Sequence, residues 1–86
     1  MIEKNITIAN ESGLHARPAS EFVRFIKPFD AKISLVKGEK TVNAKSILHV
    51  LSLSLKQGDI CTVQVDGTQE EEVLEKIETF LAELKD

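Results

Sequence analysis

The sequence predicts an α+β fold, an open-faced β-sandwich in which a four-stranded antiparallel sheet carries three helices on one face. Four short segments alternate apolar and polar residues, so each strand has a single apolar face. Three other segments repeat apolar residues every three or four positions, as helices with one apolar stripe do. Because only one side of each strand is apolar, the helices should cover that side and leave the other to water. The order along the chain is β-α-β-β-α-β-α.

Strands are expected at four places. Residues 2–8 alternate, with isoleucines on one face. Residues 31–35 and 41–43 alternate on either side of a turn that contains glycine, so these two segments should form a hairpin. Residues 60–65 are rich in β-branched side chains, which favour a strand, and the Asp-Gly pair that follows should end it.

The helices are predicted from spacing and capping residues. The first begins near His15 and ends before Pro28, because a proline disfavours helix in the residue that precedes it. Ser46 as an N-cap favours a short helix, rather than a strand, for the dense apolar run after it. Thr68 with Glu71 is typical of a capping box at the start of the last helix. The apolar residues at helical spacing after Ser46 are Ile47, Leu48, Leu51 and Leu55.

Length and composition indicate one small globular domain spanning residues 1–86. The net charge of −3 argues against nucleic acid as a partner. No apolar run is long enough for a signal peptide or a membrane span, so we expect a cytoplasmic protein without membrane insertion. A single cysteine, Cys61, excludes an internal disulfide and should pack as a small hydrophobe.

The residues with chemical potential concentrate between Ser12 and Ser20. Pro18 lacks an N–H group and fits the first turn of a helix, so the N–H groups of Ala16 and Arg17 should be free there. These groups, the positive end of the helix dipole and the Arg17 guanidinium converge beside His15, which makes a site for an anion such as phosphate. A neutral imidazole, whose ordinary pKa is about 6.5, can attack phosphorus. A helix-capping histidine beside a surface arginine is the simpler alternative.

The full segment 13–19, Gly-Leu-His-Ala-Arg-Pro-Ala, resembles the active-site segment of HPr, the histidine-containing phosphocarrier of the bacterial phosphoenolpyruvate-dependent sugar phosphotransferase system. The resemblance covers essentially the whole chain. It implies that the first two strands are parallel, with the fourth between them. It further implies that His15 accepts a phosphoryl group from enzyme I and passes it to the IIA domain of a sugar permease, and that Arg17 balances the phosphoryl charge. Ser12 and Ser20 are close enough in sequence to offer hydroxyls, although plain solvation explains them equally well.

The resemblance also implies a partner-binding surface on the short helix. Ile47, Leu48 and Leu51 match the contact patch of the family, and the alternative is that all three are core. A helix this short cannot bury every apolar residue that it carries, so some should be exposed. The residues expected to bind phosphate are Ser12, Ala16 and Arg17, and those expected to contact partners are Ser20, Arg24, Lys27, Lys45, Ile47, Leu48 and Leu51.

Ser46 matches the serine that HPr kinase/phosphorylase phosphorylates in part of the family. An N-cap role does not exclude this, because a phosphate is tolerated at a helix N-terminus and would act by repelling a partner. Family members often carry glycine where this chain has His49 and Ser54, so its partner surface should differ there. A metal-binding role for His49 is disfavoured, because the sequence shows no companion ligands, and no cofactor is expected.

Three function classes remain open from the sequence. The first is a phosphocarrier in sugar uptake, which the segment 45–47 favours by its similarity to the sugar branch of the family. The second is a regulatory, nitrogen-type phosphorelay carrier not coupled to sugar uptake, which the acidic segment 69–72 resembles. The third is a small enzyme or binding module, for which only Glu11 and Glu21 lie near His15 as acids or bases. We expect a monomeric carrier that is not itself an enzyme.

Overall fold

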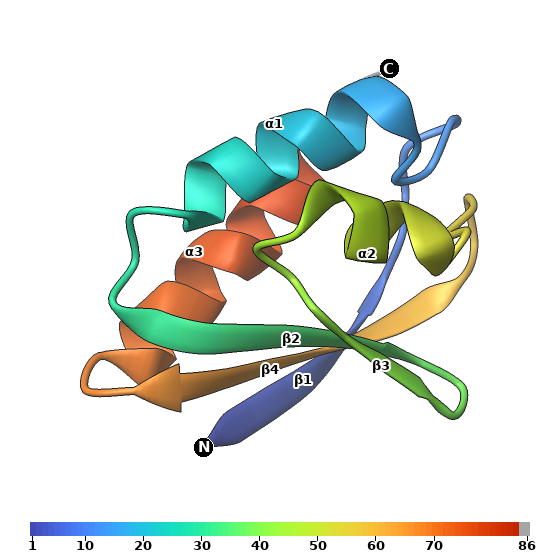
Figure 1. The fold of residues 1–86 in the computed structure, drawn as a ribbon. Coiled ribbons are helices and arrows are strands. Elements are labelled where there is room, and N and C mark those ends of the chain that lie inside the picture. The colour runs from blue at the N-terminus through green and yellow to red at the C-terminus, as the bar shows by residue number, and fades with distance from the viewer. Residues whose placement is uncertain (85–86) are drawn as a thin grey trace.

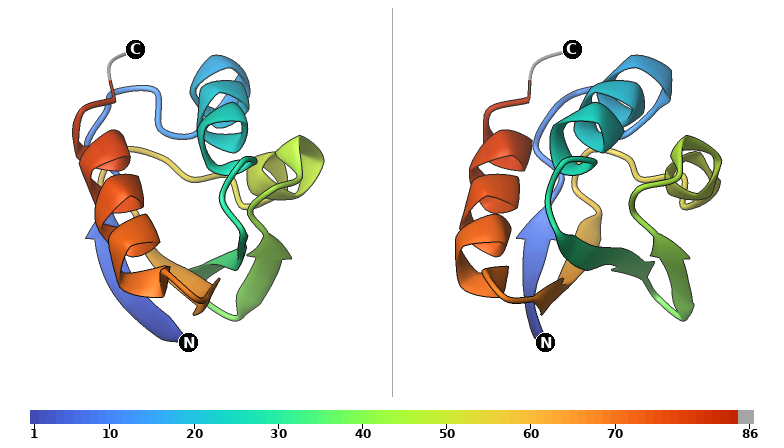
Figure 2. Two further views of the ribbon diagram at one scale, coloured as in Figure 1. Left: turned by 90° about the vertical axis from the view of Figure 1, so that its left-hand side faces the viewer. Right: turned by 60° about the vertical axis from the view of Figure 1, so that its left-hand side comes forward.

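The computed structural model describes residues 1–84 and confirms the predicted fold class. One antiparallel sheet, in the order β1-β4-β2-β3, carries all three helices on the same face (Figures 1 and 2). Both β1 and β2 pair antiparallel to β4, so they run in the same direction with β4 between them, as the family resemblance implied. The elements are β1 (Ile2–Thr7), α1 (Ala16–Ile26), β2 (Ala31–Lys37), β3 (Lys40–Asn43), α2 (Ile47–Ser52), β4 (Ile60–Gly67) and α3 (Glu70–Ala82).

The two faces of the sheet differ as the alternation predicts. The inner face contributes buried side chains such as Ile33, Leu35 and Val63, and these pack against the apolar stripes of the helices. The outer face is polar, and neighbouring strands are linked across it by side chains. The Thr62 hydroxyl donates a hydrogen bond to Asn5 Oδ1 at 2.6 Å, and the Gln64 amide donates one to Glu3 at 3.1 Å. No helix within residues 1–84 combines the length and the hydrophobicity needed to cross a membrane.

The start of α3 differs from the prediction. β4 includes the Asp-Gly pair as its last two residues and does not stop at Val65, and Gly67 pairs with Ala31 of β2. The capping box of Thr68 with Glu71 is also wrong: Gln69 occupies the N-cap position, and its side chain makes no capping hydrogen bond. Instead, Glu70 accepts a hydrogen bond from the Gly67 N–H at 3.3 Å and pairs with the N-terminal ammonium at 3.2 Å. Because β4 continues to Gly67, α3 starts one residue later than predicted, with Gln69 and not Thr68 as its N-cap.

The short helix is shorter than its apolar spacing suggests. α2 ends at Ser52, so Leu55 lies beyond it, although its side chain is buried in the same core. The reason is a change of backbone conformation after the helix, where Ser54 has a φ of +51° that no right-handed helix accommodates. The N-cap prediction is confirmed, because the Ser46 hydroxyl oxygen accepts a hydrogen bond from the His49 N–H at 3.4 Å.

Candidate functional site

His15 is the N-cap residue of α1, where the sequence placed the helix start. Its backbone is extended, with φ −103° and ψ −168°, and its carbonyl accepts the first hydrogen bond of the helix, from the Ala19 N–H at 2.9 Å. The ring nitrogen Nδ1 accepts a hydrogen bond from the Ala16 N–H at 2.8 Å. We expected the Ala16 N–H to be free, and this prediction is wrong, because the His15 ring accepts its hydrogen bond. Because Nδ1 accepts this bond, it carries no proton, and the proton of the neutral ring sits on Nε2.

The loop before α1 holds His15 in this position. The Leu14 N–H donates to the Leu55 carbonyl at 3.1 Å, and the Leu14 side chain is buried. Gly13 has a φ of +67°, and a Cβ atom there would lie 2.2 Å from the Leu55 carbonyl oxygen. Only glycine permits this approach without displacing the backbone. The buried Asn10 amide donates to the Gly13 carbonyl at 2.8 Å and closes the turn. These contacts hold the backbone that leads into His15.

A shallow hollow of about 410 Å³ lies beside the His15 ring, between the start of α1 and the end of α2. Ser12 and Ala16 line it from the α1 side, while Ser54 and Lys56 line it from the segment that follows α2. The sequence did not indicate that Ser54 and Lys56 would meet His15, because some forty residues separate them. In the sequence, Ser54 stands out as a difference from the family, and Lys56 only as the start of a polar turn.

Lys37, at the end of β2, binds the segment after α2 that contributes Ser54 and Lys56 to the hollow. Its ammonium donates a hydrogen bond to the Ser54 carbonyl at 3.0 Å and pairs with Asp59 at 3.0 Å. Asp59 also accepts a hydrogen bond from the Lys56 N–H at 2.9 Å. The Lys56 N–H and the Lys37 ammonium together hold the pKa of the Asp59 carboxyl below its usual range, because both favour the charged form.

The other residues predicted on the α1 side differ in exposure. Arg17 is exposed, and no hydrogen bond or ion pair joins its guanidinium to another of residues 1–84, so it can turn toward an anion at His15. Arg24 and Lys27 are exposed at the last turn of α1. Ser20 is half-buried on the same helix, and Ser12 is exposed at the rim of the hollow.

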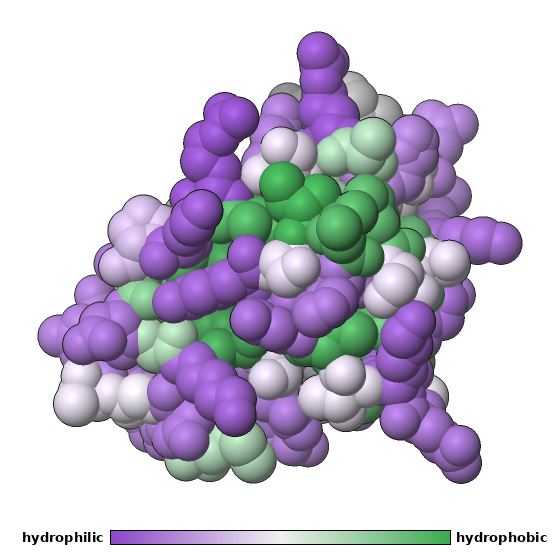
Figure 3. Space-filling model, in the orientation of Figure 1, coloured by the Kyte–Doolittle hydropathy of each residue, from purple (hydrophilic) through white to green (hydrophobic). Residues whose placement is uncertain are grey.

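The predicted contact patch on α2 is partly exposed, as expected for so short a helix. Leu48 exposes 78% of its surface and Ile47 42%, whereas Leu51 is half-buried. Figure 3 shows hydrophobic side chains gathered in the middle of the face that carries α1 and α2, with hydrophilic side chains around and between them. Lys45 is less available than expected, because its half-buried ammonium donates to the Phe29 carbonyl at 2.6 Å. This hydrogen bond links the residue before α2 to the segment that follows α1.

Two further side chains were singled out from the sequence. His49 is exposed on α2, and no three histidine, cysteine, aspartate or glutamate side chains cluster as metal ligands within residues 1–84. Cys61 lies in β4 under the helices, where burial raises the pKa of its thiol to about 11. A thiol with so high a pKa is a poor nucleophile at neutral pH.

This geometry of a capping histidine, an adjacent arginine and a neighbouring apolar patch agrees with the comparisons with known proteins. The family model described as "PTS HPr component phosphorylation site" matches residues 2–83. The chain belongs to the HPr family. It is therefore a phosphocarrier of the phosphotransferase system. Over 84 residues it is 37% identical to the phosphocarrier protein HPr of Vibrio cholerae, and the match covers 98% of this chain and 99% of that protein.

Solved HPr structures share the fold. The HPr of Bacillus anthracis superposes with a TM-score of 0.88 at 38% identity, covering 92% of this chain and 94% of that chain. An HPr dimer from Thermoanaerobacter tengcongensis superposes with a TM-score of 0.71 at 42% identity, covering 96% and 94%. The family resemblance drawn from the sequence is thus confirmed. Because an HPr relative forms a dimer, the monomeric state expected for this chain stays a prediction.

Proposed function

We propose that His15 accepts a phosphoryl group from phospho-enzyme I and passes it to the IIA domain of a sugar permease, with residues 1–86 acting as one carrier domain. The observation that supports this most directly is the hydrogen bond from the Ala16 N–H to His15 Nδ1 at 2.8 Å. It keeps the lone pair of Nδ1 unprotonated and directed at the helix N-terminus. The nucleophilic atom and the anion-binding groups therefore face each other.

The transfer follows from this arrangement. The Nδ1 lone pair forms a bond to phosphorus while the bond between phosphorus and its donor atom on enzyme I breaks, so no other reactant is consumed. As the new bond forms, the Ala16 N–H turns from Nδ1 to a phosphoryl oxygen. The Arg17 guanidinium supplies further charge-assisted hydrogen bonds to the oxygens, and the Ser12 hydroxyl stands at the rim of the same hollow. The reverse sequence delivers the group to a IIA domain.

Partner recognition in this proposal uses the patch of Ile47, Leu48 and Leu51. Exposed leucine and isoleucine side chains supply apolar contact area, and the cations Arg24 and Lys27 at the edge attract an acidic partner. Both enzyme I and the IIA domain would then dock on the face that presents His15. Ser20 lies on α1 within this face. Because one protomer supplies the whole surface, the proposed active species is the monomer.

Regulation in this proposal acts at Ser46, the N-cap of α2. HPr kinase/phosphorylase would add a phosphate next to the apolar patch, where its charge repels an acidic partner and leaves the helix folded. Coupling to sugar uptake is the branch favoured by the sequence around Ser46. A nitrogen-type regulatory carrier is the alternative, and the genes that neighbour this one distinguish the two.

The decisive experiment is labelling with radioactive phosphoenolpyruvate and enzyme I. The parent protein should take up one acid-labile, base-stable phosphoryl group, and His15→Ala should take up none. His49→Ala is the matched control, because it removes the other histidine of the chain and should be labelled like the parent. Label on His15→Ala, or its loss from His49→Ala alone, would place the acceptor at His49 and overturn the proposal.

A further inference from the structure

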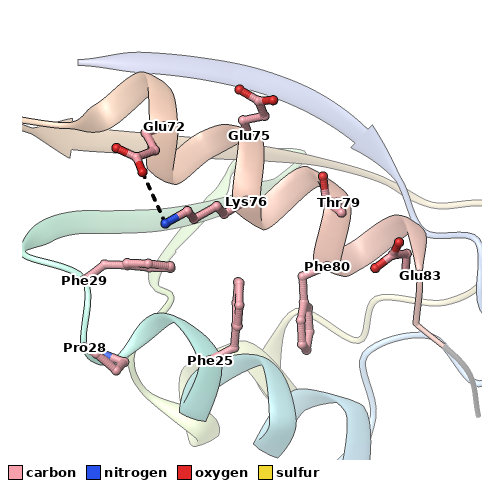
Figure 4. A pocket seen from close by; sticks show the side chains of 9 residues that line it. All are labelled: Phe25, Pro28, Phe29, Glu72, Glu75, Lys76, Thr79, Phe80 and Glu83. Atoms are coloured by element: carbon pink, nitrogen blue, oxygen red, sulfur yellow. Dashed lines mark ion pairs between the residues drawn. The ribbon is translucent and has the colours of Figure 1, made fainter.

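A second and larger hollow, of about 660 Å³, lies between α1 and α3 (Figure 4). Phe25 and Pro28 line it from the C-terminal end of α1, whereas His15 caps the other end of that helix. A helix of this length places the two ends about 15 Å apart. The groove is therefore separate from the phosphorylation site, and nothing in the proposed phosphoryl transfer uses it.

The groove has aromatic walls. The rings of Phe25 and Phe80 stack with centroids 4.5 Å apart and an interplanar angle of 14°, and Phe29 meets Phe25 edge-on at 5.4 Å. All three rings are only partly buried, whereas Phe22 is completely buried in the core. Figure 4 shows Phe25 and Phe80 standing between the two helices and Phe29 closing one end. Apolar area of this kind, left open by a small protein, is suited to contact with another apolar group.

The rim of the groove is acidic. Glu72, Glu75 and Glu83 line it, and the one cation beside them, Lys76, is already engaged. Its ammonium pairs with Glu72 at 3.3 Å and lies 5.8 Å from the centroid of the Phe29 ring. The carboxylates of Glu75 and Glu83 make no ion pair or hydrogen bond within residues 1–84. Two unpaired negative charges thus flank an aromatic surface that already accepts a lysine.

Charge and spacing indicate the kind of occupant. Glu83 follows Glu75 by eight positions, which is about 12 Å along a helix, so one compact cation cannot contact both. A peptide with cationic side chains on either side of an apolar one can. A second copy of this chain is a poor fit, because α3 carries five glutamates and one lysine and would repel another α3.

We propose that this α1–α3 groove is a docking surface for a basic, amphipathic segment of a partner protein. An apolar side chain of the segment packs against the phenylalanine rings, and its lysines or arginines pair with Glu75 and Glu83. The surroundings of His15 carry the opposite charge, through Arg17 beside it and Lys56 in the wall of its hollow. The two surfaces therefore select different partners, and the carrier can be held at the groove while His15 exchanges phosphoryl groups.

The test uses a synthetic helical peptide of about 14 residues, with leucine and phenylalanine on one face and lysine on the other. It is titrated into ¹⁵N-labelled protein at physiological salt and followed by NMR. The amides of α3 and of the end of α1 should shift, while those around His15 and α2 stay in place. The same peptide with glutamate in place of lysine should cause no shift. His15→Ala should bind the lysine peptide like the parent, so this result does not depend on the proposed phosphoryl transfer.

A pair of double variants separates a specific site from general charge attraction. Glu75→Lys/Glu83→Lys should weaken peptide binding at least about tenfold, because each change replaces a pairing carboxylate by a like charge. Glu39→Lys/Glu71→Lys makes the same change in net charge at exposed residues outside the groove and should change affinity less than about twofold. Equal loss in both variants, shifts confined to α2, or concentration-dependent groove shifts without peptide would each overturn the proposal.

Discussion

Ser54 is the one non-glycine residue within residues 1–84 that has a positive φ, 51°. This left-handed conformation costs an ordinary residue roughly 1–2 kcal/mol, because Cβ crowds the carbonyl oxygen. A residue of β2 stabilises this conformation, because the Ser54 carbonyl accepts a hydrogen bond from the Lys37 ammonium at 3.0 Å. A glycine at this position would adopt the same conformation freely.

Ser54→Gly should therefore stabilise the protein. The relief of backbone strain exceeds the entropy that glycine adds to the unfolded chain, so we expect a net gain of about 0.5–1 kcal/mol and a higher melting temperature. Ser52→Gly is the matched control. Ser52 is helical and its hydroxyl donates to the His49 carbonyl at 2.6 Å, so this variant should melt earlier. Lower stability of Ser54→Gly would mean that the serine hydroxyl has a stabilising partner.

α2 shows how an element of six residues is fixed without much helix propensity. Val50 anchors it in the core, and two lysines hold its ends. Lys45 binds the Phe29 carbonyl before the helix, and Lys40 donates to the Ser52 carbonyl at 3.1 Å at its last residue. Lysine beside a C-terminal carbonyl also opposes the negative end of the helix dipole. The exposed face of Leu48 therefore has a defined orientation toward partners.

Ser46→Asp tests whether this face is the docking surface. Aspartate can cap α2 as serine does, so stability should be unchanged or higher by a few tenths of a kcal/mol. Its charge at the edge of the patch should raise the KM of enzyme I for this protein and leave kcat less affected, because what is lost is uniform binding. Ser46→Asn is the control, since it caps without charge and should keep the KM of the parent. An unchanged KM for a stably folded Ser46→Asp would move the docking surface elsewhere.

At the scale of the whole molecule, the pairing of Lys37 with Asp59 joins the sheet to the segment that lines the hollow beside His15. Lys37 ends β2, and Asp59 directly precedes β4, where its carbonyl accepts a hydrogen bond from the Ile8 N–H at 2.9 Å. The site is thus assembled by the sheet as well as by the helix that carries the histidine. Loss of this pairing should loosen the wall of the hollow that Ser54 and Lys56 form.

Asp59→Asn should lower stability at neutral pH, and the difference from the parent should shrink in acid. The folded-state pKa of Asp59 lies below its unfolded value of about 3.9, so its contribution is complete above that value and is lost as the pH falls through the folded pKa. Thermal unfolding of both proteins between pH 7 and pH 2 measures this. Asp30→Asn, at an exposed residue before β2, should follow the parent throughout. A constant difference at all pH values would mean that the carboxylate charge is irrelevant.

The sequence by itself determined the elements and the family, and it singled out the candidate site around His15. Alternation and helical spacing report which side of a segment is apolar, and this is a local property. Pro18 and Ser46 likewise located two helix starts, because caps and first turns involve residues within four positions. The segment 13–19 was specific enough to identify the family.

Only the tertiary structure decided which distant residues meet. At the start of α3, pairing of β1 with β4 brings the N-terminal ammonium within 3.2 Å of Glu70, a contact between residues far apart in the chain that no local capping pattern predicts. The hollow beside His15 required α2 to dock against α1, and the acidic groove required α3 to lie along the other end of α1. Such contacts depend on how whole elements pack, and the local spacing of side chains carries no record of the partner that each face will find.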